Sequence, residues 1–349
     1  MVRFADIVQS KYRTEKSDRP APVRAEADGF RLGDLPLFEE RQKKIPASLC
    51  AEESRMSEAA TYYKKLLEDA RDVRDRVKRN QRIDPFPIHT KIHSIVNSHL
   101  VDEMYVYAMS QPASGEMLMD VMEITFASMK VGKGMGYGTQ KLIKVGLAAF
   151  LGNVGIHKVP SSILRKRERL TKEELKAIRA HPFISYRILD RTGERYRWLA
   201  KLALQTHERS DGSGYPRGLK DKQISETASI IGLTETYIAM VNRRPYRDGY
   251  SQTDAVRFVI REAKKQFPGK VLKAFINEIS LYPLNTLVRL NSKAIGRVQA
   301  THRDRPQRPA IALLYDSEGN RIRVPRTVDL SEDPLLYIVE IIDKKDLPQ

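Results

Sequence analysis

The chain of 349 residues contains a single cysteine, Cys50, so no disulfide can form within it. It also lacks an apolar run near the ~20 residues that a membrane-spanning helix needs. The best candidate, residues 145–154, is short and includes Gly152 and Asn153. The first residues lack the apolar core of a secretory signal. These absences favour a protein of the reducing cytoplasm.

The sequence shows no zinc-finger spacing, no basic zipper and no aromatic-rich motif of an RNA-recognition fold. It does carry 61 Lys and Arg against 44 Asp and Glu, a net charge of +17. Such an excess favours anionic partners, which include nucleic acid, acidic membrane surfaces, nucleotides and acidic proteins. The charge is spread over several segments, so we interpret most of it as a solvated surface. These segments are residues 64–91, 165–179, 187–197, 243–247 and 297–308.

Composition and periodicity divide the chain into four parts. Residues 1–50 are basic and interrupted by proline, and we expect a flexible arm. Residues 51–110 are helical, with apolar positions recurring every three or four residues between Ser57 and Asn80. Residues 111–283 form consecutive helices. Residues 284–349 change to short alternating segments, which predict a small all-β domain.

Local signals fix several element ends. Thr171 and Glu174 have the spacing of a capping box. Pro182 and Pro268 suit the first turn of a helix. The glycine-rich run 132–138 predicts a helix end and a turn rather than a phosphate-binding loop, because GxxxxGK[ST] after a strand is absent. Expected strands are residues 287–290, 294–300, 310–315, 321–324 and 336–342, with Gly319-Asn320 in a hairpin turn.

The most informative stretch is residues 207–216, which read HERSDGSGYP. This resembles the HHExxDGxGYP signature of the HD-GYP family, whose active members open cyclic di-GMP with a cluster of two or three metal ions. Three further segments resemble the family in the same order: VGLAAFLGNVGIHKVPSSIL, LTKEELKAIRAHPFISYRIL and ASIIGLTETYIAMVNRRPYR. The resemblance covers roughly residues 120–283. It implies a mainly α fold, an HD-superfamily helical bundle, followed by the small C-terminal all-β domain.

The resemblance also implies which residues stand at the metal-ligand positions, and many of them are unsuited to the task. Gly152-Asn153 replaces the His-Asp pair that gives the family its name, Ile156 replaces a lysine expected to face phosphate, and Thr206 replaces the first histidine of a double histidine. The retained or altered positions are Asp120 in place of the first histidine, His181, His207, and Glu235 in place of a late aspartate. Glu116, one turn before Asp120, matches a carboxylate that some three-metal members use.

A two-metal site needs a bridging anion between cations ~3.5–4 Å apart, and a neutral amide cannot supply that charge. We therefore expect no working binuclear centre and no catalytic residue. The residual set Asp120, His181, His207 and Glu235 could hold at most a single Mn or Fe ion. We interpret His157 as incidental. His89, His93 and His99 have near-helical spacing and are read as a helix surface rather than a zinc site.

Other matched positions keep their residue types. The loop retains Asp211, Gly212, Gly214, Tyr215 and Pro216, and its glycines and proline give it a defined shape. In the family this loop is thought to contact cyclase domains, although packing between helices is an alternative role. Arg244 and Arg247 match positions that face nucleotide phosphates, and arginine binds phosphate without a metal. A plain surface role for both arginines also stays open.

The leading hypothesis is a degenerate, non-catalytic HD-GYP-type signalling protein that binds cyclic di-GMP or a partner such as a GGDEF-domain cyclase. One alternative is a residual metal-dependent phosphodiesterase or phosphohydrolase. The other is a basic nucleic-acid-binding protein. Homodimer formation through the helix between Ser57 and Asn80 is a further possibility, and packing of that helix onto the main domain is its alternative.

Overall fold

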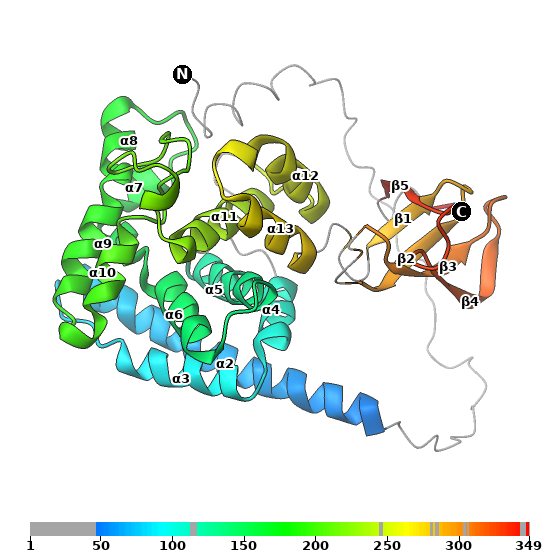
Figure 1. The fold of residues 1–349 in the computed structure, drawn as a ribbon, viewed down its shortest axis with the longest axis horizontal. Helices are drawn as coiled ribbons and strands as arrows, with labels where there is room; N and C mark the ends of the chain where they lie inside the picture. Colours follow the sequence, from blue (N-terminus) through cyan, green and yellow to red (C-terminus); the bar gives the residue numbers. More distant parts are fainter. Residues whose placement is uncertain are drawn as a thin grey trace, which may run out of the picture. The chain divides into compact units, whose positions relative to one another are not determined.

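The structure is a computed structural model, which describes residues 47–111, 117–243, 247–279, 282, 286–302, 305, 307–342 and 347–348. The predicted arm up to residue 46, together with Glu116 and Arg244, lies outside the described residues. Figure 1 shows helices from α2 to α13, followed by the strands β1–β5.

Before residue 280 the regular elements of the described chain are helices and short 3-10 turns, joined by loops. They are α2 (Ala47–Lys78), α3 (Phe86–Asn97), α4 (Val101–Ser110), α5 (Met117–Gly134), α6 (Thr139–Leu151), η1 (Val154–Lys158), α7 (Ser161–Leu164), α8 (Lys172–Arg179), α9 (His181–Asp190), η2 (Glu194–Tyr196), α10 (Arg197–Ala203), η3 (Asp221–Gln223), α11 (Glu226–Val241), α12 (Gln252–Glu262), η4 (Ala263–Lys265) and α13 (Gly269–Glu278). The mainly α fold class is confirmed.

Helix α2 begins at Ala47, ten residues before the predicted start, so residues 47–50 are helical rather than part of an arm. Its apolar positions recur every three or four residues and are buried against α3, α4, α5 and η1. They are Ala59, Tyr63, Leu66, Ala70, Val73 and Val77. The structure thus shows α2 packed along the bundle (Figure 1), which was one of the two predicted roles for this helix.

The predicted helix ends are confirmed. Thr171 Oγ1 accepts the Glu174 N–H, and the Glu174 carboxylate accepts the Thr171 N–H, which closes the capping box of α8. Pro182 lies in the first turn of α9. Pro268 is the N-cap of α13. In the glycine-rich run, Gly136 has φ +76° and makes the turn between α5 and α6.

The centre of the bundle is α5, whose residues are buried on nearly all sides. It packs against α4, α6, α11 and α13. Such a helix needs small or apolar side chains at most positions, and the polar ones must find hydrogen bonds inside. Ser128 on α5 does so through Thr234 on α11, with 2.7 Å between their hydroxyl oxygens. This contact aligns the two helices that carry Asp120 and Glu235.

The C-terminal strands form one antiparallel sheet within the described residues, in the order β4-β3-β2-β1-β5. The strands are β1 (Leu287–Leu290), β2 (Ile295–Ala300), β3 (Ala310–Tyr315), β4 (Arg321–Asp329) and β5 (Ile338–Ile341). Register pairs such as Val298 with Ile311 place buried residues opposite one another. Strand β4 continues to Asp329, beyond the predicted end at Val324, because its second half pairs with Ala310–Leu313.

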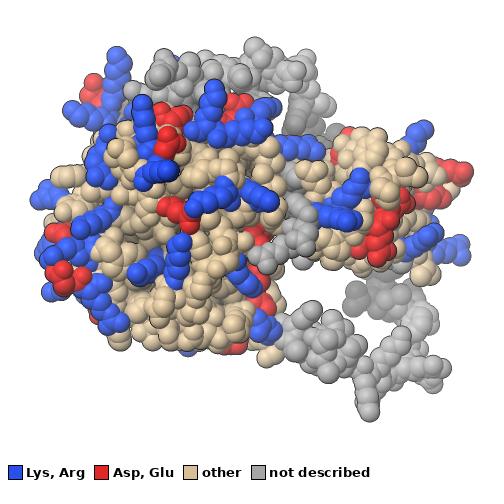
Figure 2. All heavy atoms as spheres, viewed as in Figure 1, with Lys and Arg blue, Asp and Glu red and all other residues tan. Residues whose placement is uncertain are grey.

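Lys and Arg side chains are spread over the visible face with Asp and Glu among them (Figure 2). This distribution agrees with a largely solvated basic surface. Within the part of the chain that the structure describes, no helix combines the length and the apolar character needed to cross a bilayer.

One surface cluster joins three helices and generates a pH-dependent contribution to stability. The Glu226 carboxylate, at the start of α11, accepts hydrogen bonds from Tyr137, Lys141 and Lys270. Burial raises the pKa of Glu226, but these three donors together outweigh it and lower the pKa from 4.5 to about 2. A lowered pKa means that the carboxylate stabilises the fold above the unfolded value of 4.5 and loses this effect as the pH falls towards 2.

We expect Glu226→Gln to lower the free energy of unfolding by about 1 kcal/mol at neutral pH, since solvent screens the two exposed lysines. The difference from the parent protein should shrink steadily below the unfolded pKa of 4.5. Urea unfolding of both proteins across this range measures the difference. A cost that stays constant down to the folded pKa would contradict the assignment.

Candidate functional site

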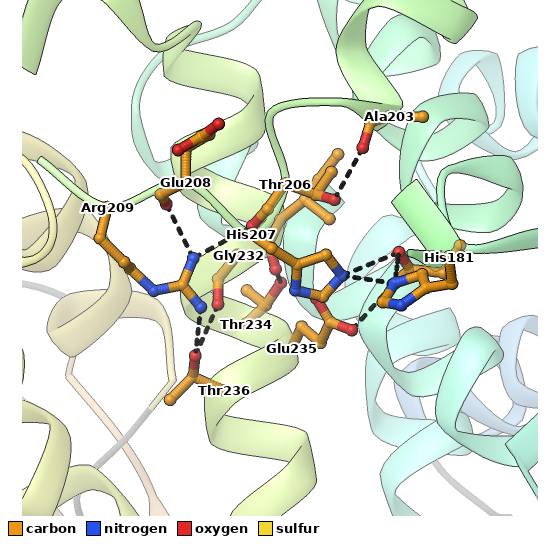
Figure 3. A network of polar contacts seen from close by, with 12 residues as sticks. His181, Ala203, Thr206, His207, Glu208, Arg209, Gly232, Thr234, Glu235 and Thr236 are labelled. Carbon is orange, nitrogen blue, oxygen red and sulfur yellow. Dashed lines mark hydrogen bonds and ion pairs between the residues drawn. The ribbon is translucent and has the colours of Figure 1, made fainter. Parts of the chain in front are cut away.

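Two of the predicted site residues, His181 and His207, face each other inside the bundle. His181 is the first residue of α9, and His207 follows the end of α10. Their Nε2 atoms are 2.8 Å apart, and both lie near the side-chain oxygen of Asn153, at 3.3 and 3.2 Å (Figure 3 shows the histidine contacts). These residues are far apart in the sequence, and they come together because α9 packs against both η1 and α10.

The hydrogen-bond partners indicate where each ring carries its proton. His181 Nδ1 lies 2.7 Å from the Ile178 carbonyl oxygen, which can only accept, so this nitrogen carries the proton. His181 Nε2 is then an acceptor, and His207 Nε2 donates to it. The same His207 N–H points towards Asn153 Oδ1. Two neutral imidazoles therefore satisfy one another without an ion.

The protein environment keeps both rings neutral. Burial lowers the pKa of His181 to about 4, although the bond to Ile178 acts in the opposite direction. Burial also holds the pKa of His207 well below its usual value, and the nearby His181 and Arg209 add to this effect. Desolvation disfavours the charged form of a buried imidazole. At neutral pH both histidines can serve as hydrogen-bond partners or as ligands.

Asn153 connects the histidines to α11. Its Nδ2 donates to Glu235 Oε1 at 2.8 Å, while its Oδ1 faces the two imidazoles. An amide has both a donor and an acceptor, whereas a carboxylate would have only acceptors. Glu235 also lies 3.6 Å from His207 Nδ1. The residues at three predicted positions are thus brought together, with Asn153 at the centre.

The other three altered positions, Thr206, Gly152 and Ile156, supply no ligand atom to the histidine pair. Thr206 is fully buried, and its hydroxyl lies 3.4 Å from the Ala203 carbonyl, within the preceding helix. Gly152 ends α6, and a Cβ built on it would lie 3.7 Å from Thr206 Cγ2. Ile156 in η1 lines a neighbouring cavity with its apolar side chain. None of the three presents a nitrogen or carboxylate to the histidine pair.

Asp120 belongs to a different buried polar group. Its Oδ1 accepts from Asn242 Nδ2 at 2.6 Å, and the same amide also donates to Glu123. All three side chains are less than a tenth exposed. Asp120 still lines the cavity beside the histidines. Sequence reasoning found neither Asn242 nor Glu123, because no local pattern marks an amide that pairs with residues more than a hundred positions away.

The retained loop is held by a carboxylate inside its own motif. Glu208, 2% exposed, accepts the backbone N–H groups of Arg217 at 2.8 Å and Leu219 at 2.9 Å. Gly212 has φ +77°, and a Cβ on Gly214 would come within 2.4 Å of the Arg209 nitrogen. Both positions therefore require glycine. Glu208 was not singled out from the sequence, although its place directly after His207 is the available signal.

The loop also covers the histidines. The Tyr215 ring stacks on His207 with 4.9 Å between centroids and 6° between planes. The Arg179 guanidinium also lies over the Tyr215 ring, 5.4 Å from its centroid. Tyr215 N–H donates to the His207 carbonyl at 3.1 Å. Asp211 Oδ1 accepts from Ser213, whereas Pro216 is exposed at the surface. The loop thus has a packing role, and contact with a cyclase domain stays a prediction.

Arg247 is directed to the C-terminal end of α11. Its guanidinium donates to the carbonyls of Ala239, Met240 and Asp248, and it lies over the Tyr250 ring at 4.9 Å. A cation at a helix C-terminus satisfies carbonyls that lack intrahelical partners. Arg247 thus has a structural role at the end of α11. Phosphate binding by Arg247 and by Arg244 stays a prediction.

The remaining histidines lie apart from the pair. His89 meets Tyr196 edge to face, with 6.0 Å between ring centroids, whereas His93 and His99 are exposed. His157 in η1 lines the cavity, and burial together with the charges of Lys78 and Arg74 lowers its pKa to about 4. It was predicted to be incidental to the ligand positions, which stays a prediction, and it lies in the cavity wall.

The cavity beside the histidines has a volume of about 800 Å³, within the ~300–1,000 Å³ typical of small-molecule sites. It combines site residues with a group of cations. The lining includes Asp120, Asn153, Ile156, His157, His181 and Glu235, together with the cations Arg74, Lys78, Lys158 and Arg165.

The residues present do not fit a two-metal centre. Gly152 has no side-chain donor, the Thr206 hydroxyl lies against Ala203, and the Asn153 amide group donates to Glu235. Among the residues that the structure describes, no three His, Cys, Asp or Glu side chains are grouped so as to hold a metal ion. A bridging carboxylate between two cations has no counterpart here.

Two known domain types cover most of the described chain. The HD domain pattern matches residues 99–271, and a KOW domain associated with HD domains matches residues 287–349. The small β sheet described above lies in the second region.

Curated relatives share the helical part. The cyclic di-GMP phosphodiesterase PdeB of Borreliella burgdorferi is 33% identical over 187 residues, which covers 54% of this chain and 49% of the relative. A cyclic di-GMP phosphodiesterase of Thermotoga maritima is 34% identical over 154 residues, covering 44% of this chain and 42% of the relative. The matched regions thus span less than half of each relative.

A solved structure agrees in fold. Bd1817, an HD-GYP-type protein from Bdellovibrio bacteriovorus, superposes with a TM-score of 0.52 at 13% identity, covering 68% of this chain and 73% of that one. This superposition shows a shared fold. The HD domain match and the curated relatives support membership of the chain in the HD-GYP family of HD-domain proteins.

We expect Asn153→Asp to lower the free energy of unfolding by about 1–3 kcal/mol in metal-free buffer. The change removes the N–H donor to Glu235 and sets two carboxylates side by side in a partly buried site. Added Mn²⁺ should recover part of the loss, since two carboxylates and two imidazoles form a suitable donor set. Thermal unfolding with and without Mn²⁺ tests this.

The exposed Asn97→Asp variant is the matched control for that experiment. It should show neither the loss nor the recovery with Mn²⁺. Equal stability of the Asn153→Asp variant and the parent in metal-free buffer would show that the hydrogen bond from the Asn153 amide to Glu235 does not stabilise the site.

Glu208→Ala should destabilise the protein by about 2 kcal/mol, because two backbone N–H groups lose a charged acceptor. Hydrogen exchange at Arg217 and Leu219 should accelerate along with this loss. Glu68→Ala on the exposed side of α2 is the matched control. Unchanged exchange at both amides would rule out this role for Glu208.

Proposed function

We propose that this chain is a non-catalytic HD-GYP-type signalling protein that binds cyclic di-GMP in the cavity beside His181 and His207 without opening it. The observation that carries the proposal is the amide of Asn153, which replaces the family's bridging carboxylate and connects both neutral histidines to Glu235 by hydrogen bonds. A site closed in this way has no anionic bridge for paired metal ions.

Two further features support recognition of the nucleotide. The cavity of about 800 Å³ accommodates a ligand of this size. Four cationic side chains and two carboxylates line it, so its charge suits a ligand with two phosphodiester groups. Relatives of the helical region are named as cyclic di-GMP phosphodiesterases, which makes this nucleotide the first ligand to test.

A second candidate is residual hydrolysis with one metal ion. The convergence of the two Nε2 atoms beside Asn153 Oδ1 favours it, because imidazole nitrogens are common ligands of Mn and Fe. In that case His207 would carry its proton on Nδ1, towards Glu235. The two candidates therefore differ in the proton position on one ring and in the presence of bound metal.

Calorimetry with cyclic di-GMP, combined with chromatography of the nucleotide after incubation with Mn²⁺ or Fe²⁺, separates the candidates. We expect saturable binding and intact nucleotide, with the Thermotoga maritima relative as the positive control for hydrolysis. Turnover that His207→Ala abolishes would overturn the proposal in favour of the metal-dependent enzyme. Absence of any binding would overturn both.

A further inference from the structure

The wall of the cavity includes residues from outside the HD domain. The HD pattern begins at residue 99, whereas α2 ends at Lys78. Yet Arg74 and Lys78 line the same cavity as Asn153 and His181. Helix α2 therefore contributes cationic side chains to the site that the HD domain forms.

The end of α2 is fastened to the cavity wall. Lys158, the last residue of η1, donates to the Lys78 carbonyl at 3.0 Å and to Asn80 Oδ1 at 2.7 Å. A lysine at this place satisfies a carbonyl of the last helical turn and complements the helix dipole. Val73 and Val77 are buried on the same stretch of α2. These contacts hold the end of α2 against η1 and so determine where Lys78 lies along the cavity wall.

The orientation of the cations is also constrained. Arg74 Nε bonds Asp75 Oδ1 at 2.8 Å, which limits the directions that the guanidinium can take. Lys78 and Arg165 are exposed at the rim, so both can move onto a ligand without breaking a buried contact. The lowered pKa of His157 has Lys78 and Arg74 among its causes after burial, which agrees with a positive potential at this wall.

We propose that Arg74, Lys78 and Arg165 form a phosphate-binding lip, in which side chains of α2 and of the segment after α7 hold a phosphodiester group of a cyclic dinucleotide. The identity of the nucleotide rests on the proposed function, whereas the lip itself rests on the cavity lining. Arginine gives paired charge-assisted hydrogen bonds to phosphate, and lysine acts as a mobile point charge. Recognition by the lip requires no metal ion.

The test compares Lys78→Met with Lys64→Met, a matched control on the same helix that is exposed and outside the cavity. Lys78→Met should weaken cyclic di-GMP binding about tenfold, the effect of losing a charge-assisted hydrogen bond, without changing the melting temperature. Lys64→Met should leave the affinity unchanged. Arg165→Met, on the other side of the lip, should weaken binding as Lys78→Met does. Agreement between the two variants would show that the loss of affinity does not come from misfolding of one of them.

Titration of the same proteins with inorganic pyrophosphate separates the lip from the proposed function. If cyclic di-GMP binds parent and both lip variants equally well, the lip is refuted and the proposed function survives. If the nucleotide fails to bind but pyrophosphate binds and Lys78→Met weakens it, the lip stands and the proposed function falls. If neither anion binds the parent protein, both are refuted.

Discussion

The site depends on one constraint, which is that polar groups inside the protein must have hydrogen-bond partners. Asn153 meets it because its amide donates to Glu235 while its oxygen faces two neutral imidazoles. A carboxylate at this position would need cations to balance it. With the amide, His181 and His207 satisfy each other directly, and the bundle can close around them with protein groups alone.

The loop of residues 207–216 is held in place by contacts that do not depend on the altered metal-ligand positions. Its Glu208 accepts the backbone N–H groups of Arg217 and Leu219, which follow the loop, and its Tyr215 stacks on the His207 ring. Neither contact uses an ion. The shape of the loop and the chemistry of the metal positions are therefore separable in physical terms, so one can be kept while the other is lost.

The fold was predictable to a large extent, because its signals are local. The capping box at Thr171 and Glu174, the turn at Gly136 and the alternation of the C-terminal strands all depend on neighbours in sequence. The family motif also placed His181 and His207 in one site. Pairings between distant elements were not predictable: the Asn242 amide on Asp120, the guanidinium of Arg247 on the end of α11, and the entry of α2 into the cavity wall. These depend on how the helices pack, which periodicity does not encode.

Side-chain cations and metal ions have different chemical roles at a phosphodiester. Both offset the negative charge of the ligand, but a metal ion also lowers the pKa of bound water and so generates the attacking hydroxide. Lysine and arginine bind phosphate without supplying that nucleophile. In the proposed arrangement the lip of Arg74, Lys78 and Arg165 therefore retains the ligand, while the hydrogen-bond network around Asn153 supplies no nucleophile that attacks it. Binding and hydrolysis, which one metal cluster would serve together, are then uncoupled within a single cavity.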